Sequence, residues 1–451
     1  MSSVALLLLL AQVGQVNGDV VVVPDPSGTG HTTNNLIAGL GSTLCAFASK
    51  GVYSVKPDVF DAVFVFTTHP LSGSAIGSPA TPKGTVVRAE YTSGVVWGSP
   101  LIVLQPSEFG SPQRLLHCAF MGPLQNLPAN PDDDFLLPAF PSGTMPSGTT
   151  GIEVMGHEFG HHWMVLSAFD TGNGMLDALH RSDDRMPLMG MQMNRVSAAG
   201  VHYSHLADTQ SVMYGNFITP LGGGMYRLAG GARKYGPMDQ YFMGLLAPEL
   251  TPPMLVLDDG SQMGLIGTPL RAGETQTVSA QREVRVSVAD FVRAQGVRTP
   301  AFPNTKRCFR VAFALAVQQG MTATPQQIAM VDTYRRRWEQ WFKFATDGRG
   351  STVTSLDVFA PCPEPELDAD GGVIPEVDAG IVDAGMQQPE PDAGMMEQPQ
   401  PQSDAGDGDN GRIDTGKIRP GCGCGSTDVA AFTFALMALF SLRRHRRATR
   451  L

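Results

Sequence analysis

The amino-acid composition changes abruptly after Pro361, and this change limits how much of the chain can form a core. Residues 363–420 contain 14 acidic and 3 basic residues and few large apolar side chains. Asp-Ala-Gly recurs here, beginning at Asp378, Asp383, Asp392 and Asp404. Such a stretch cannot bury enough apolar surface to offset the entropy lost on ordering. We therefore predict a disordered, self-repelling linker at 361–420 and one folded domain at 20–360.

The same stretch carries the charge imbalance of the chain. The formal net charge is −10, from 32 Lys and Arg residues against 42 Asp and Glu residues. Residues 363–420 alone contribute −11, which is 3 basic minus 14 acidic residues. The remainder is near neutral and lacks the basic stripe that binds nucleic acid, so we exclude nucleic acid as a partner.

Strand and helix patterns alternate within 20–360, which predicts an α+β fold. Short apolar runs bounded by turn residues predict strands at 63–66, 85–91 and 101–104. Residues 123–150 are rich in Pro, Gly, Asn and Asp and predict a long surface loop.

Two predicted helices begin at clear caps. Thr150-Gly151-Ile152-Glu153 is a capping box, and the apolar face that follows predicts a helix that ends before Asp170. The second helix begins at Thr324, followed by Pro at the first helical position. Its apolar stripe predicts core packing and comprises Val331, Tyr334, Trp338, Trp341 and Phe342.

Residues 157–161 read His-Glu-Phe-Gly-His within the first helix. Because residues four apart share a helix face, His157 and His161 can bind one zinc ion through neutral imidazole nitrogens. Glu158 lies beside them, where a general base would take a proton from water. Zinc lowers the pKa of a bound water toward about 7 and polarises a carbonyl oxygen. The alternative is that these are two histidines and a glutamate on an ordinary helix face.

The motif itself does not identify a third metal ligand. A metzincin has His at the position of Ser167, and a gluzincin has a downstream Glu, whereas none occurs here between Glu158 and Glu249. Those two classes are therefore excluded. The remaining candidates are Asp177, His180, Asp183, Asp184, His202, His205, Asp208 and Asp239.

Residues 235–244 read Tyr-Gly-Pro-Met-Asp-Gln-Tyr-Phe-Met-Gly and resemble the Gly-Thr-x-Asp-x-x-Tyr-Gly signature of aspzincins, in which the Asp binds zinc. Pro237 replaces the Thr of that signature, and its Tyr is displaced to Tyr241. The resemblance implies Asp239 as the third ligand. The alternative is a first-turn or N-cap Asp of a short helix.

The chain also resembles a group of uncharacterised myxobacterial HExxH metallopeptidases. The shared elements are His157–His161, His202-Tyr203-Ser204, the turn 211–216 and the segment 235–244. The resemblance covers most of 55–355 and implies a zincin-like domain, with a mixed sheet packed on the active-site helix. His202 is an alternative ligand, or a group that binds the tetrahedral oxyanion.

We also assign expected roles to one tyrosine and three histidines. Tyr241 is a candidate oxyanion donor or a core residue. We expect His205 to be structural, and His162 and His180 to lie on the surface.

The C-terminal segment 421–451 contains Gly-Cys-Gly-Cys-Gly, an apolar run from Val429 to Leu442, and an Arg-rich end. It resembles the MYXO-CTERM sorting signal of myxobacterial surface proteins, which has the same three parts. The resemblance implies processing at the Cys region by surface-sorting machinery. The apolar run predicts a short transmembrane helix, with its basic end in the cytoplasm. A plain tail anchor is the alternative.

The N-terminal run Val4–Ala11 is apolar and has the length of a signal peptide, although no Lys or Arg precedes it. We predict a signal peptide at 1–19, with a buried strand or helix as the alternative. Cys45, Cys118, Cys308 and Cys362 have no metal-ligand spacing and predict two disulfides in an exported protein. Of three possible pairings, Cys45–Cys118 and Cys308–Cys362 are favoured because each pair is closer in sequence.

These features predict an exported zinc endopeptidase at the cell surface that hydrolyses extracellular proteins or peptides. Two other functions stay open. One is a non-catalytic surface protein for adhesion or recognition, with a metal-stabilised fold. The other is a metal-dependent hydrolase that acts on a different bond.

Overall fold

The computed structural model describes residues 13–25, 44–69, 109–134, 149–164, 167–172, 203–230, 234–258, 270, 273–365 and 367, and the backbone of short segments at 36–37, 41–43, 83–84, 90–92, 95–97, 177–178, 185–187 and 198–200. The chain divides into two units, Met1–Ile374 and Pro375–Leu451, and the described residues belong to the first. Several sequence predictions lie outside the described residues: residues 1–12 of the leader, the strand at 101–104, His180, Asp183, Asp184, His202, most of the linker and the C-terminal segment.

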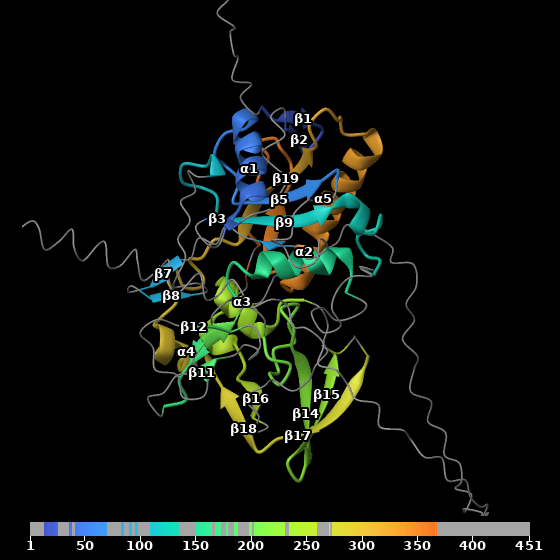
Figure 1. The fold of residues 1–451 in the computed structure, drawn as a ribbon. Helices are drawn as coiled ribbons and strands as arrows, with labels where there is room; N and C mark the ends of the chain where they lie inside the picture. The colour runs from blue at the N-terminus through green and yellow to red at the C-terminus, as the bar shows by residue number, and fades with distance from the viewer. Residues whose placement is uncertain are drawn as a thin grey trace, which may run out of the picture. The chain divides into compact units, whose positions relative to one another are not determined.

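A seven-stranded mixed sheet lies in the upper part of the first unit as drawn in Figure 1. Its order is β1-β2-β19-β5-β9-β6, and β20 pairs with β19. The strands are β1 (Gln15–Asn17), β2 (Val20–Pro24), β5 (Ala62–Thr67), β6 (Lys83–Gly84), β9 (His117–Pro123), β19 (Cys308–Val317) and β20 (Ser351–Val353). β2, β19, β5 and β9 run parallel, whereas β1 and β6 pair antiparallel at the two edges. The predicted α+β class with a mixed sheet is confirmed.

Helices cover both faces of this sheet. Because successive side chains of a strand point to opposite faces, Phe64 and Phe313 pack with helices α2 (Gly151–Gly160) and α5 (Pro325–Ala345). Val63 and Val65 pack with helix α1 (Thr43–Val55) on the other side. The near-continuous apolar runs of β5 and β19 are typical of parallel strands buried on both faces.

The α5 helix begins at the predicted cap, where the Thr324 hydroxyl accepts from the Gln327 backbone N–H at 3.2 Å. Its predicted core face is buried and includes Val331, Tyr334, Trp338, Trp341 and Phe342. The prediction that this stripe packs in the core is therefore confirmed.

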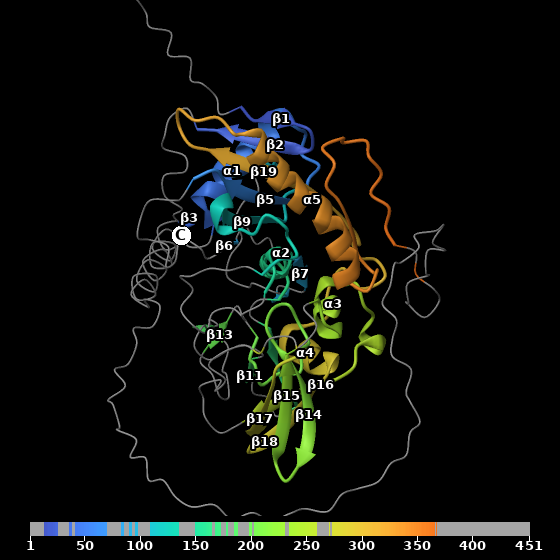
Figure 2. The same cartoon turned by 90° about the vertical axis from the view of Figure 1, so that its right-hand side faces the viewer.

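Smaller sheets and helices follow α2 along the chain (Figure 2). β14 (Asn216–Gly222), β15 (Met225–Gly230) and β17 (Thr275–Ser279) form one antiparallel sheet, and β16 (Met254–Asp258) pairs with β18 (Arg282–Val286). The remaining helices are α3 (Pro237–Met243) and α4 (Val288–Gln295), with 3-10 turns at Leu124–Asn126 and Pro248–Leu250. Short two-stranded ladders complete the described elements: β3 (Leu36–Ile37), β4 (Gly41–Ser42), β7 (Glu90–Thr92), β8 (Val95–Trp97), β10 (Ala168–Phe169), β11 (Asp177–Ala178), β12 (Arg185–Pro187) and β13 (Ala198–Gly200).

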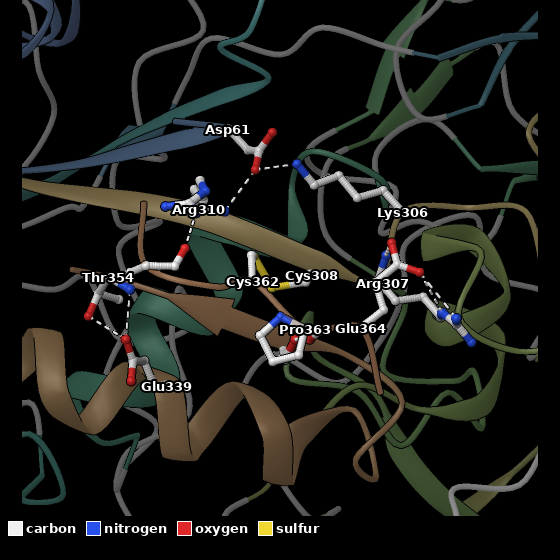
Figure 3. Close-up of a disulfide and its surroundings, with 12 residues drawn as sticks. Asp61, Lys306, Arg307, Cys308, Arg310, Glu339, Thr354, Cys362, Pro363 and Glu364 are labelled. Carbon is white, nitrogen blue, oxygen red and sulfur yellow. Dashed lines mark hydrogen bonds and ion pairs between the residues drawn. A yellow bond between two sulfur atoms is a disulfide. The ribbon is translucent and has the colours of Figure 1, made fainter. Parts of the chain in front are cut away.

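Both favoured disulfides, Cys45–Cys118 and Cys308–Cys362, are present. The second ties the segment after β20 to the start of β19 (Figure 3). Beside it, Arg307 forms an ion pair with Glu364, and the Ser351 hydroxyl donates to the Pro363 carbonyl at 2.8 Å. The end of the folded unit is thus fixed where the acidic stretch begins. Two disulfides are typical of an exported protein.

The strand β1 falls within the range predicted as a leader. It pairs with β2 in register from Gln15 to Asn17. Asp19 accepts hydrogen bonds from the Leu356 backbone N–H at 2.8 Å and from the Ser355 hydroxyl at 3.2 Å. A chain that begins at Val20 would lose these contacts. Within the described part of the chain, no helix is long and apolar enough to cross a membrane.

Candidate metal centre and general base

Helix α2 carries the His-Glu-Phe-Gly-His sequence, and its start is fixed by the predicted capping box. The Glu153 backbone N–H donates to the Thr150 hydroxyl at 3.3 Å, and the Glu153 carboxylate accepts from the Thr150 N–H at 2.8 Å. These two bonds satisfy backbone donors that the first helical turn leaves free.

Helix α2 ends before Asp170, as predicted, and is short. The helix ends at Gly160, with His161 as its C-cap, and does not continue toward Asp170. The cause is a tighter turn, in which the His162 N–H donates to Phe159 O at 3.1 Å and the Trp163 N–H to Gly160 O at 3.0 Å. His161 keeps right-handed helical angles, so it still lies on the same face as His157.

His157, Glu158 and His161 form a compact group on this face. One candidate ligand atom from each of the three lies within 4.8 Å of the others. The two imidazole centroids are 4.7 Å apart, and all three side chains are buried. Among the described His, Cys, Asp and Glu side chains, this is the one group of three or more with that spacing.

A backbone carbonyl fixes how His157 presents its nitrogens. His157 Nδ1 lies 2.9 Å from the carbonyl oxygen of Val212. Because a carbonyl can only accept, Nδ1 carries the proton and donates it, which leaves the Nε2 lone pair for a metal. Zinc-binding histidines commonly donate their other ring N–H in this way. The donor set of this group therefore fits a zinc ion.

The turn that supplies this carbonyl also places an aromatic ring against His157. The Tyr214 ring centroid lies 4.6 Å from that of His157, with an interplanar angle of 31°. Val212 and Tyr214 are contacts of the site that the sequence did not reveal, because both are more than fifty residues from His157 along the chain. In the sequence, Tyr214-Gly215 indicates a turn, but it does not indicate which residues that turn contacts.

Two further histidines lie close to α2 and are buried. His117, on β9, is within 5.5 Å of the Phe159 ring and 6.1 Å of the His162 ring, measured between centroids. Burial lowers the pKa of His117 to about 3, against a smaller opposing effect of the Glu158 backbone, so His117 is neutral. The prediction that His162 lies on the surface is wrong, because the turn after Gly160 folds its side chain inward.

Asp239 lies in the first turn of α3 and is fully buried. Its Oδ2 accepts from the Gly236 backbone N–H at 2.8 Å. The group around His157 does not include Asp239, so this geometry gives no support to the prediction that Asp239 binds the metal. The alternative, a first-turn Asp of a short helix, describes what the structure shows. Tyr241, on the same helix, lies beside Phe242 and Arg298.

The two other described candidates, His205 and Asp208, have other contacts. The His205 carbonyl accepts from the Asn216 side chain at 2.8 Å, and the His205 ring lies 6.3 Å from that of Tyr214. Asp208 Oδ1 accepts from the Ile218 N–H at 3.2 Å. Neither residue belongs to the group at His157. The other five candidates have side chains outside the described part of the structure: Asp177, His180, Asp183, Asp184 and His202.

The buried carboxyl of Asp239 predicts a pH dependence of stability. Burial raises the pKa of Asp239 from 3.8 to about 7, although Ser211, Gly236 and Tyr203 oppose this through hydrogen bonds. Between these two pH values the folded protein keeps a proton that the unfolded chain has lost, so stability falls as pH rises from about 4 to 7. The effect is roughly 4 kcal/mol for a shift of this size.

Asp239→Asn is therefore expected to flatten the pH dependence of the unfolding free energy over this range, measured by urea unfolding. Asp290 is a matched control because it also lies in the first turn of its helix, α4. Burial raises the pKa of Asp290, but hydrogen bonds from Ser287 and Arg293 and the Arg293 charge lower it overall. In Asp290→Asn, the unfolding free energy should still fall between pH 4 and 7. An Asp239→Asn curve as steep as that of the wild type would contradict the expectation.

No protein-family model, no curated protein and no solved structure matches this chain. What the site can do is therefore inferred from its own groups. These are two buried imidazoles on one helix face and a carboxylate between them. They can bind one cation and accept one proton.

Proposed function

We propose that this protein is a zinc-dependent endopeptidase with a zincin-like catalytic domain. The observation that carries the proposal is the group of His157, Glu158 and His161 on α2, together with the Val212 carbonyl that selects the His157 tautomer. An accidental motif on a solvated helix face would place its side chains in water. Here all three are buried beside a core of aromatic rings.

His157 and His161 would hold the zinc ion, with Asp239 or His202 as the third ligand. When bound, zinc supplies a Lewis acid that activates water and polarises the scissile carbonyl. Glu158 accepts the proton of the attacking water on its carboxylate and passes it to the nitrogen of the leaving amine. Burial of Glu158 keeps bulk water from competing for that proton.

The setting that we propose is the cell surface. The two disulfides support export. Segment 421–451 would be processed by surface-sorting machinery and would hold the protein at a membrane, with the acidic stretch as a spacer. Its substrates would be extracellular proteins or peptides.

Metal removal tests the proposed reaction. The purified full-length protein is expected to cleave casein, to lose this activity after treatment with 1,10-phenanthroline, and to regain it when zinc is added. The measurement is release of acid-soluble peptides. Protein that contains zinc but cleaves neither casein nor a peptide library would favour the non-catalytic surface protein. Activity that is unchanged by the chelator would contradict a metal-dependent reaction.

A further inference from the structure

The turn from Ser211 to Asn216 lies directly against the metal-binding face of α2. The Val212 carbonyl accepts from His157 Nδ1 at 2.9 Å. The next residue, Met213, is buried, and its Sδ would lie 2.5 Å from a Cβ built on Gly160. The Met213 carbonyl in turn accepts from the Tyr203 N–H at 3.1 Å. The turn is thus part of the wall behind the His157 imidazole.

The backbone of Tyr214 is held in an unfavourable conformation within this turn. Its φ is +69°, in the left-handed region that a bulky aromatic residue rarely adopts. Such a residue costs about 1–3 kcal/mol and persists only when its surroundings hold it. Here the Thr209 hydroxyl donates to the Tyr214 carbonyl at 3.1 Å. A Cβ on the following Gly215 would overlap Thr209 Oγ1, so only glycine fits beside this hydrogen bond.

The consequence of this conformation is the position of the Tyr214 ring. Tyr214 is 5% exposed, and its ring lies against the His157 imidazole, with centroids 4.6 Å apart and an interplanar angle of 31°. The Val212 carbonyl lies at the edge of the same imidazole, at Nδ1. One contact opposes tilting of the imidazole and the other opposes rotation about its Cβ–Cγ bond. Two residues of one turn, Val212 and Tyr214, therefore restrict His157 in two directions.

We propose that Tyr214 is a positioning residue that holds the His157 imidazole so that its Nε2 faces the metal. The proposal rests on the proposed function, because it concerns the same zinc site. The aromatic ring of Tyr214, and not its hydroxyl, performs this role, because the ring contacts the imidazole. The backbone strain at Tyr214 is the cost of placing that ring, and it explains why an unfavourable residue occupies a left-handed position next to the site.

Zinc affinity of full-length variants tests this role. Tyr214→Gly removes the ring and relaxes the backbone, because glycine tolerates positive φ. We expect its zinc dissociation constant to rise about 10–100-fold, the range found when groups that orient a metal ligand are lost. Tyr214→Phe keeps the ring and should stay within about threefold of the wild type. Competition with a chromophoric chelator gives the constants, and the absorption spectrum of the cobalt-substituted protein reports changed ligand geometry in Tyr214→Gly alone.

Tyr226 provides a matched control, because its ring is buried to a similar degree but packs in a separate cluster with Leu228. Tyr226→Ala should lower stability without changing zinc affinity. If Tyr214→Gly fails to fold, Tyr214→Leu replaces it and should bind zinc more weakly than Tyr214→Phe.

Three outcomes would overturn the proposal, and they separate it from the proposed function. Zinc binding by Tyr214→Gly as tight as that of the wild type would exclude a positioning role and leave the peptidase proposal intact. Equal loss in Tyr214→Phe and Tyr214→Gly would assign the role to the hydroxyl instead of the ring. Wild-type protein without zinc affinity would overturn the proposed function itself, and the role of Tyr214 with it.

Discussion

Glu158→Gln is expected to reduce kcat for peptide hydrolysis by about 10²–10⁴-fold, the range that a positioned general base contributes. Glutamine has the shape of glutamate, but its amide cannot accept the proton of the attacking water. His157 and His161 are unchanged in the variant, so zinc should remain bound. The measurement is steady-state hydrolysis of a quenched fluorescent peptide, with zinc content determined on the same sample.

Glu153→Gln is the matched control for this experiment. It makes the same chemical change five residues earlier on the same helix. Glu153 lies at the third position of α2 and caps Thr150, and glutamine also forms capping boxes. Its kcat should therefore stay within about twofold of the wild type. A Glu158→Gln enzyme as active as Glu153→Gln would exclude Glu158 as the general base.

Gly156→Ala is expected to destabilise the fold by roughly 2 kcal/mol or more, although alanine favours a helix by about 1 kcal/mol. A Cβ on Gly156 would overlap the indole ring of Trp341. That indole is stacked on Trp338, with centroids 5.4 Å apart, and lies 5.7 Å from the Tyr235 ring. Because Trp341 is buried among these rings, we expect α2 or α5 to shift. The measurement is the urea unfolding free energy.

Gly160→Ala gives the comparison, because there the added methyl meets the thioether of Met213 at 2.5 Å. A methionine side chain can change its rotamers, so this loss should be smaller. Trp341→Leu should recover part of the stability of Gly156→Ala, because the two residues are in contact and their effects are not additive. Wild-type stability of Gly156→Ala alone would contradict the close approach of the two helices.

Features set by neighbouring residues could be predicted from the sequence. The starts of α2 and α5 follow from capping boxes, which act within four residues. The buried stripe of α5 follows from helical periodicity. The pairing Cys308–Cys362 follows from nearness along the chain. That His157 and His161 lie on one face of α2 also follows from local sequence, because residues four apart share a helix face.

Features set by distant residues could not be predicted in this way. Helix α1 was not among the predicted helices, and its buried face packs against β2 and β5. The burial of His162 depends on the turn after α2, and its ring lies 6.1 Å from that of His117 on β9. Tyr214 reaches His157 from a separate turn, and no local pattern connects the two. Asp239 was assigned by a motif, and the hydrogen bond that its Oδ2 accepts from the Gly236 backbone N–H could not be read from that motif.

Zinc content of the purified full-length protein tests the central claim most directly. Metal analysis after dialysis is expected to find one zinc per chain in the wild type and in Glu158→Gln. Almost none should remain in His157→Ala or in His161→Ala, because each variant removes one of the two imidazoles that share the α2 face. His117→Ala is the control, since this buried histidine lies outside the group, and it should keep its zinc. Equal zinc in the wild type and in His157→Ala, or no zinc in the wild type, would contradict the metal centre.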